Sequence, residues 1–252
     1  MLHAFLRNKS GLHRRYLPAK QRDPGNGRVT QEDEVTSTVL GPLEFLPKSS
    51  TTLFWTELIR TYAPSFGLPD GDATDAVMRF WPTFGKLQPD LLVELKWGRE
   101  VRLLLIEIKW LSNLSGDNQL EKQWLSCLSR QERAVALHLF IGIETAEGYK
   151  ALAQKDVWGG RLVLLSWMQV LNTVFHIRNA DSPQLHAWAR HVLHFLRLVG
   201  IVPFKGFDEL SAPEHPIGRG SIFWRGTHGF IGLLAPDVPE RAQKPIFFHV
   251  SD

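Results

Sequence analysis

The chain has 252 residues, of which 44% are hydrophobic, so it can form one large domain with a sizeable apolar core. A single cysteine, Cys127, excludes a disulfide framework and a cysteine-rich zinc site, and makes a reducing cytoplasm the default compartment. No stretch resembles a secretory signal or a membrane span, and the formal net charge is only +3.

That small charge is unevenly distributed along the chain. The first 22 residues contain six basic residues and no acid, which leaves the remainder net acidic. The segment 1–29 is therefore predicted to be a basic arm that contacts a polyanion such as nucleic acid. A solvated, flexible terminus is the alternative.

After the arm, the pattern of apolar residues predicts helices and strands in alternation. A helix is expected from about Thr30 to before Pro47, with Pro42 as an interruption, and a second helix over 51–62. Strands are predicted at 77–81, 91–95, 101–109, 134–143 and 161–165, and helices at 117–133, 145–155 and 167–175. This order predicts an α/β sheet with helices on both faces.

The last third of the chain differs in character. Ser182 or Asp181 is expected to cap a helix that ends near Leu198, and a Gly- and Pro-rich stretch with short apolar runs follows Gly200. The predicted organisation is a basic arm at 1–29, a core at 30–178, and a C-terminal helix with a small β-rich appendage at 179–252.

The most informative segment is an acidic hairpin. Gly98-Arg99 suits the centre of a two-residue turn, and a hairpin centred there places Asp90 directly opposite Glu107. Residues that face each other across two strands have Cβ atoms about 4.5–5.5 Å apart, so the two carboxylates repel. A divalent cation between them would offset that repulsion, and Mg²⁺ prefers a few carboxylates together with water and phosphate oxygens.

Lys109 lies two residues after Glu107, so both side chains are expected on one face of the strand, with Ile108 on the other. A lysine beside a metal site can orient an attacking water and stabilise charge on a phosphate. An ordinary surface hairpin with acids at its open end is the alternative.

Pro89-Asp90, followed by Glu107-Ile108-Lys109, resembles the signature of the PD-(D/E)XK, or restriction-endonuclease-like, nuclease superfamily. The resemblance covers residues 30–170 and implies a mixed four-stranded central sheet flanked by helices. It also implies hydrolysis of phosphodiester bonds with Mg²⁺, or Mn²⁺ as a substitute. Asp90 and Glu107 would be metal ligands, joined by Ile108 through its main chain, and Lys109 would be the catalytic lysine.

Many members of that superfamily carry a further acid on the helix before the sheet. Helical spacing puts Glu32 on the apolar stripe with Val35 and Val39, whereas Glu34 shares a face with small polar residues. Glu32 is therefore the candidate for an additional metal ligand. The alternative is that Glu32, Asp33 and Glu34 only complement the N-terminal end of the helix dipole.

A glutamine pair follows the lysine. Gln119 and Gln123 are one helical turn apart, next to an apolar stripe that contains Trp124. The pattern is similar to the Gln-rich helix of several superfamily branches, although the aromatic residue comes one position late. Such glutamines contact phosphates or support the metal carboxylates, and the alternative is a solvated polar face.

Histidines could suggest a different metal site, since His186, His191 and His194 lie on the helix expected to end near Leu198. No carboxylate near them in the sequence completes such a site, so a structural role is favoured. Neither a nucleophile-elbow motif nor a P-loop is present in the sequence, which leaves serine hydrolases and NTPases without support.

The predicted function is a Mg²⁺-dependent endonuclease of a prokaryotic restriction or antiviral-defence type that cuts double-stranded DNA in the cytoplasm. Expected partners are nucleic acid and a second copy or an activating subunit, with no membrane. One rival is a non-catalytic nucleic-acid-binding or scaffold subunit with the same fold. Another is a transposase-like or junction nuclease that needs a partner.

Overall fold

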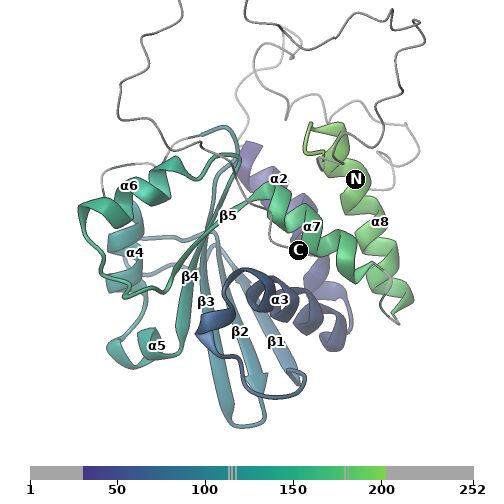
Figure 1. The fold of residues 1–252 in the computed structure, drawn as a ribbon, viewed down its shortest axis with the longest axis horizontal. Coiled ribbons are helices and arrows are strands. Elements are labelled where there is room, and N and C mark those ends of the chain that lie inside the picture. The colour runs from purple at the N-terminus through teal and green to yellow at the C-terminus, as the bar shows by residue number, and fades with distance from the viewer. Residues whose placement is uncertain are drawn as a thin grey trace, which may run out of the picture. The chain divides into compact units, whose positions relative to one another are not determined.

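The central sheet forms from the apolar segments between Asp75 and Ser166. A computed structural model describes residues 31–112, 114, 116, 118–178, 180 and 182–202. Five strands lie in the order of the sequence (Figure 1): β1 Asp75–Phe80, β2 Leu91–Trp97, β3 Glu100–Ile108, β4 Ala136–Gly142 and β5 Leu162–Ser166. The first three strands are antiparallel, and β3, β4 and β5 are parallel. The predicted α/β class with a mixed sheet is confirmed.

The sheet has the five strands that the apolar pattern predicts, whereas the resemblance implied four. At the antiparallel edge, β1 pairs with β2 over six residue pairs from Asp75–Lys96 to Phe80–Leu91, and parallel β5 forms the other edge. The four-stranded expectation was therefore wrong by one strand.

The hairpin of β2 and β3 has the predicted register. Trp97 pairs with Glu100 around a two-residue turn, and Leu91 pairs with Ile106 at the opposite end. Gly98 has a φ of +59°, which a leading glycine in such a turn can adopt without strain. Trp97 is buried and its indole N–H donates to the carbonyl of Gly71 at 3.2 Å, so it packs against the protein.

One face of the sheet is covered by the crossover helices α4 Gln119–Cys127, α5 Arg130–Ala134 and α6 Ala146–Gln154. The predicted continuous helix over 117–133 is wrong, because the chain turns to an extended conformation at Leu128. Ser129 then caps α5: its hydroxyl accepts from the main-chain N–H of Glu132, and the Glu132 carboxylate accepts from the main-chain N–H of Ser129. This capping box begins a new helix where periodicity alone suggested one long helix.

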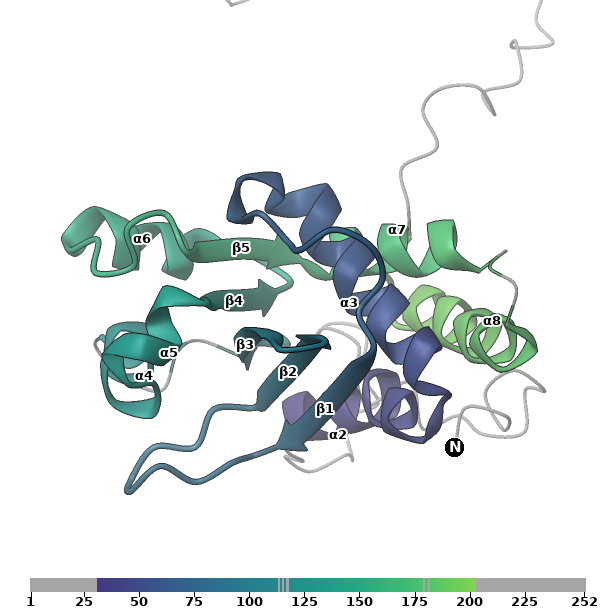
Figure 2. The ribbon, with the colours of Figure 1, turned by 90° about the horizontal axis from the view of Figure 1, so that it is seen from below.

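The other face is covered by α2 Gln31–Val39, α3 Lys48–Tyr62, α7 Trp167–Ile177 and α8 Pro183–Leu198 (Figures 1 and 2). The interruption expected at Pro42 is present, because α2 ends at Val39 and a 3-10 turn follows over Gly41–Phe45. Ser182 caps α8 as predicted, accepting a hydrogen bond from the main chain of Leu185.

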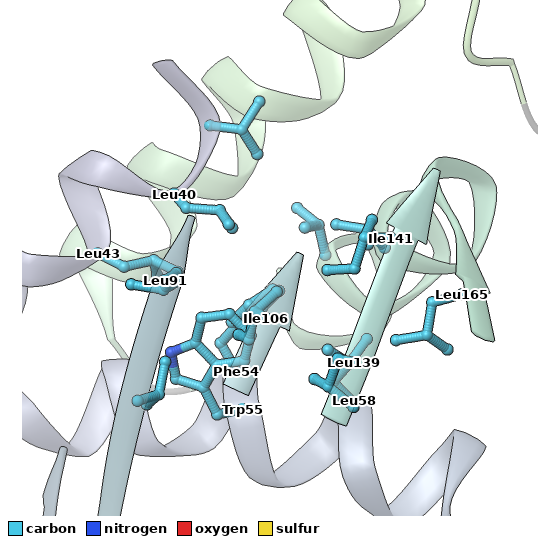
Figure 3. Packing of buried hydrophobic residues seen from close by; sticks show 14 of the residues in the cluster. Leu40, Leu43, Phe54, Trp55, Leu58, Leu91, Ile106, Leu139, Ile141 and Leu165 are labelled. Carbon is cyan, nitrogen blue, oxygen red and sulfur yellow. The ribbon is translucent and has the colours of Figure 1, made fainter. Parts of the chain in front are cut away.

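Strand alternation divides the core into two apolar layers. Leu104, Ile106 and Ile108 of β3 face the layer under α2, α3, α7 and α8, part of which is shown in Figure 3. Leu103 and Leu105 face the layer under α4. Because side chains alternate along a strand, Glu107 continues the face that is turned toward α4. The Glu107 carboxylate therefore lies on the side of the sheet that faces α4.

The chain divides into two compact units, 1–204 and 205–252. The apolar face of α8 belongs to the core layer of the first unit, through Leu185, Val192 and Leu196 among others. The predicted basic arm at 1–29, the helix cap at Thr30 and the predicted β-rich appendage lie outside the described residues.

The close packing at the end of β4 predicts a specific sensitivity to substitution. A Cβ atom added at Gly142 would lie 2.6 Å from the carbonyl oxygen of Glu144, so Gly142→Ala must displace backbone. We expect a loss of about 1–3 kcal/mol in the free energy of unfolding, as is usual for overpacking, measured by urea denaturation. Gly41→Ala is the control, because its Cβ would meet the Ser37 hydroxyl at an ordinary 3.7 Å. Equal stability of the two variants would contradict the prediction.

Candidate active site

Asp90 is the residue immediately before β2. The Leu91–Ile106 pair places it beside Glu107, as the hairpin register predicts. Its Oδ2 accepts a hydrogen bond of 2.6 Å from the main-chain N–H of Ile108, and the side chain is 7% exposed. The N–H of Ile108 is thus directed at the Asp90 carboxylate. Only the carbonyl oxygen of Ile108 could serve as a main-chain ligand for a cation.

Glu107, the penultimate residue of β3, is the most buried acid of the site at 2% exposure. Both of its oxygens are engaged. Oε1 accepts from Gln119 Nε2 at 2.6 Å and lies 2.7 Å from the ammonium of Lys109. Oε2 accepts from Gln123 Nε2 at 2.7 Å. Gln119 and Gln123, the predicted glutamine pair, therefore both donate hydrogen bonds to the carboxylate of Glu107.

Lys109 connects this cluster to α2. Its Nζ lies 2.7 Å from Glu32 Oε1 as well as 2.7 Å from Glu107. Of the three acids at the start of α2, the structure thus brings Glu32 to the site. Glu32 lies on the side of α2 that also carries buried Val35 and Val39.

The turn after Lys109 holds the second oxygen of Glu32. Oε2 accepts from the main-chain N–H of Trp110 at 3.3 Å and from the hydroxyl of Ser112. Leu111 between them has a φ of +57°, an unfavourable conformation for a leucine. The contacts of Ser112 and the Trp110 N–H with Glu32 could not be predicted from the sequence, because they depend on this backbone conformation.

Glu32, Asp90 and Glu107 together form a group with metal-binding capacity. One carboxylate oxygen from each lies within 4.8 Å of the other two. Oxygen ligands from carboxylates, completed by water, are what Mg²⁺, Mn²⁺ and Ca²⁺ accept. His186, His191 and His194 lie on α8 and are not members of this group.

Burial makes the carboxylates difficult to ionise without a cation. Desolvation, together with the neighbouring charge of Glu107, raises the pKa of Asp90 to about 8. Burial also raises the pKa of Glu107, although the Lys109 ammonium and the Gln123 amide oppose this effect. Burial acts to lower the pKa of Lys109, but the carboxylates of Glu107 and Glu32 outweigh it and raise that pKa above its usual value.

Gln123 offers an independent test of whether the residues fit a hydrated cation. Its side chain is 1% exposed, its amide nitrogen is used by Glu107, and its Oε1 is buried without a hydrogen-bond partner. An orphaned buried acceptor is costly. A water molecule in the coordination shell of a cation could donate a hydrogen bond to Gln123 Oε1. The three carboxylates together with this acceptor therefore fit a hydrated divalent ion.

An aromatic stack holds α4 in the position that brings its glutamines to Glu107. Trp124 stacks on His138 of β4 with ring centroids 5.9 Å apart, and Trp158 Nε1 donates to His138 Nδ1 at 3.0 Å. Burial lowers the pKa of His138 to about 3, so the ring stays neutral. Burial, with the nearby charge of Glu107, raises the pKa of Cys127 to about 11, which keeps this thiol protonated. Neither group is suited to proton transfer near neutral pH.

A cavity of about 240 Å³ opens beside Lys109. Its lining is formed by Lys109, Leu111, Ser112, Phe140, Ile143, Glu144, Ala146 and Glu147. Liquid water occupies about 30 Å³ per molecule, so the space admits a phosphate group with several waters. The cavity therefore reaches the edge of the carboxylate site at Lys109.

Comparison with protein-family models, with curated proteins and with solved structures finds no match for this chain. In the described part of the chain, no helix is both long and apolar enough to cross a membrane.

The raised pKa of Asp90 predicts how stability depends on pH in metal-free buffer. Between about pH 4 and pH 8 the unfolded chain loses the Asp90 proton and the folded chain keeps it, so folding becomes less favourable as pH rises. Asp90→Asn removes this penalty and retains an acceptor for the Ile108 N–H. We expect the variant to be more stable than wild type by about 1–3 kcal/mol at pH 8 in EDTA, and by less at pH 5, in urea denaturation.

Glu100→Gln, at the exposed hairpin tip, is the matched control and should not reproduce this pH-dependent gain. Asp90→Asn that is less stable than wild type at pH 8 would contradict the inferred penalty.

The orphaned oxygen of Gln123 predicts a change in cation affinity. Gln123→Met keeps the length of the side chain but can neither support Glu107 nor accept from a cation-bound water. We expect Mn²⁺ affinity, measured by calorimetry, to fall by about 10- to 100-fold, as for other groups that support metal ligands. Gln131→Met on exposed α5 should retain wild-type affinity. Unchanged affinity in a folded Gln123→Met protein would remove Gln123 from the site.

Proposed function

We propose that this chain is a metal-dependent nuclease that hydrolyses phosphodiester bonds in DNA, with Mg²⁺, or Mn²⁺ as a substitute, held by Asp90, Glu107 and Glu32. The observation that carries the proposal is the convergence of three carboxylates and one lysine in a buried pocket beside a cavity. Placing so many charges together out of water is costly for a purely structural cluster. The resemblance to the PD-(D/E)XK signature supports the same chemistry.

The carboxylates and the main chain of Ile108 would hold the cation. A divalent cation in such a site lowers the pKa of bound water and neutralises charge on the phosphate and the leaving oxygen. Asp90 is already oriented by the Ile108 N–H, and Glu107 by two amides, so little rearrangement of these side chains is needed. Their preorganisation contributes to affinity and to positioning.

Lys109 would be the catalytic lysine of the proposed reaction. Its ammonium lies between Glu107 and Glu32, and the residue is part of the lining of the cavity. Its raised pKa means that it remains charged, which suits stabilisation of negative charge on the phosphate and orientation of the attacking water through a hydrogen bond. It is not suited to act as the base that removes the proton.

The remaining polar groups act on these residues. Gln119 and Gln123 fix the orientation of the Glu107 carboxylate, and Gln123 Oε1 is available to a water of the cation. Ser112 and the Trp110 N–H hold Glu32 so that it faces Lys109. These are positioning roles, because such contacts restrain the ligands.

The proposal is tested by incubating the full-length protein with supercoiled plasmid in Mg²⁺, Mn²⁺ or EDTA. We expect metal-dependent nicking or linearisation by wild type, and a loss of at least about 100-fold for Asp90→Asn and for Lys109→Met. Lys155→Met is the control, since this exposed lysine pairs with Glu121 on the surface and should leave the rate unchanged. Asp90→Asn is informative because its expected gain in stability separates lost chemistry from lost folding.

Other outcomes distinguish the alternatives. Binding of Mn²⁺ without cleavage of any DNA would favour a nuclease that requires a partner, and a panel of branched substrates would then be the next test. Absence of both Mn²⁺ binding and cleavage in the folded protein would overturn the proposal and favour a non-catalytic subunit. Cleavage that persists in both variants would place the chemistry elsewhere.

A further inference from the structure

The helices after β5 have an unusual charge balance. Among the described residues from Leu162 to Val202 there is no aspartate or glutamate, and the sequence of that range contains one acid, Asp181. The same range carries Arg178, Arg190 and Arg197, together with several histidines. This positive surface is not used by the carboxylate site.

The basic residues of α8 form one stripe. His186, Arg190, His194 and Arg197 follow each other at intervals of four, four and three residues, so they share a face of the helix. Leu185, Trp188, Val192 and Leu196 occupy the opposite, buried face. Both arginines are exposed, and the stripe extends over roughly 16 Å at 1.5 Å per residue.

The end of α7 adds an arginine in a fixed orientation. The guanidinium of Arg178 lies 3.3 Å from the centre of the Phe175 ring, and its NH1 donates to the Phe175 carbonyl at 2.8 Å. Phe175 itself is 39% exposed. An arginine stacked on an aromatic ring keeps other N–H groups available and loses less conformational entropy when they bind a phosphate.

These helices are attached to the candidate active site by two buried hydrogen bonds. Trp167, the first residue of α7, donates from its indole to the carbonyl of Lys109 at 3.1 Å. Trp188 of α8 donates to the carbonyl of Val39 in α2, the helix that carries Glu32, at 3.0 Å. These two contacts fix α7 and α8 against the segments that carry Lys109 and Glu32.

We propose that the α7–α8 surface, through Arg178, Arg190 and Arg197, binds the sugar–phosphate backbone of duplex DNA that flanks the cleavage site. This inference rests on the proposed function, because it identifies where that substrate is held. Positive charge without intervening acids matches a polyanion, and contacts of arginine with phosphate hold a duplex without reading its sequence. The surface thus contributes affinity and placement, whereas Lys109 and the carboxylates perform the chemistry.

Binding of the full-length protein to a fluorescent 30-base-pair duplex, in EDTA and over a series of salt concentrations, tests the inference without cleavage. For Arg190→Gln/Arg197→Gln we expect affinity to fall by about 10-fold or more at low salt. The slope of log affinity against log salt should decrease in magnitude by about two, one for each lost phosphate contact. Arg99→Gln/Arg130→Gln is the matched control, since it removes the same charge from the exposed hairpin tip and from α5.

Equal losses in the two double variants, no loss in Arg190→Gln/Arg197→Gln, or no binding of DNA by wild type would overturn the inference. A stronger interaction with polyglutamate than with DNA would also overturn it, in favour of an acidic protein partner. If wild type binds DNA through this surface but cuts nothing in Mg²⁺ or Mn²⁺, the surface stands and the proposed nuclease activity fails.

Discussion

The structure of the site depends on one constraint, the placement of the Asp90 and Glu107 carboxylates side by side and out of water. Such a pair is unfavourable in itself, as the raised pKa values of both groups show. Some neighbouring groups reduce that penalty, since Lys109 supplies a positive charge and the Ile108 N–H and two glutamine amides donate hydrogen bonds. Glu32 acts in the opposite direction, because its negative charge raises the pKa of both carboxyls and it shares the lysine. Three carboxylates with one lysine leave excess negative charge that a divalent cation would offset, and this excess is the basis of the proposed metal site.

The parts of the site that depend on regular geometry could be predicted from the sequence. The two-residue turn and the alternation of side chains place Asp90 beside Glu107, and Lys109 on the same face. Helical periodicity selects Glu32 from its neighbours and puts Gln119 and Gln123 on one face. In each case a fixed repeat of 2 or 3.6 residues converts positions in the chain into positions in space.

The parts that depend on irregular backbone or on contacts between distant segments could not. Ser112 reaches Glu32 only because Leu111 adopts a left-handed conformation, for which the sequence carries no signal. The stack of Trp124 on His138 joins residues from separate elements. The break at Leu128 is a different case, since Ser129 and Glu132 have the spacing of a capping box in the sequence itself.

The turn at Gly98 and Arg99 sets which residues of β2 and β3 face each other, and so decides which side chains meet at the opposite end of the hairpin. Seven residue pairs join β2 and β3 between the turn and the carboxylates, and each pair transmits the register to the next. A slip of one residue would leave the amino-acid content and the number of strand hydrogen bonds nearly unchanged, yet it would set an isoleucine opposite Asp90. A change in the length of this turn would therefore alter the site more than a change in its side chains, although no atom of the turn belongs to the site.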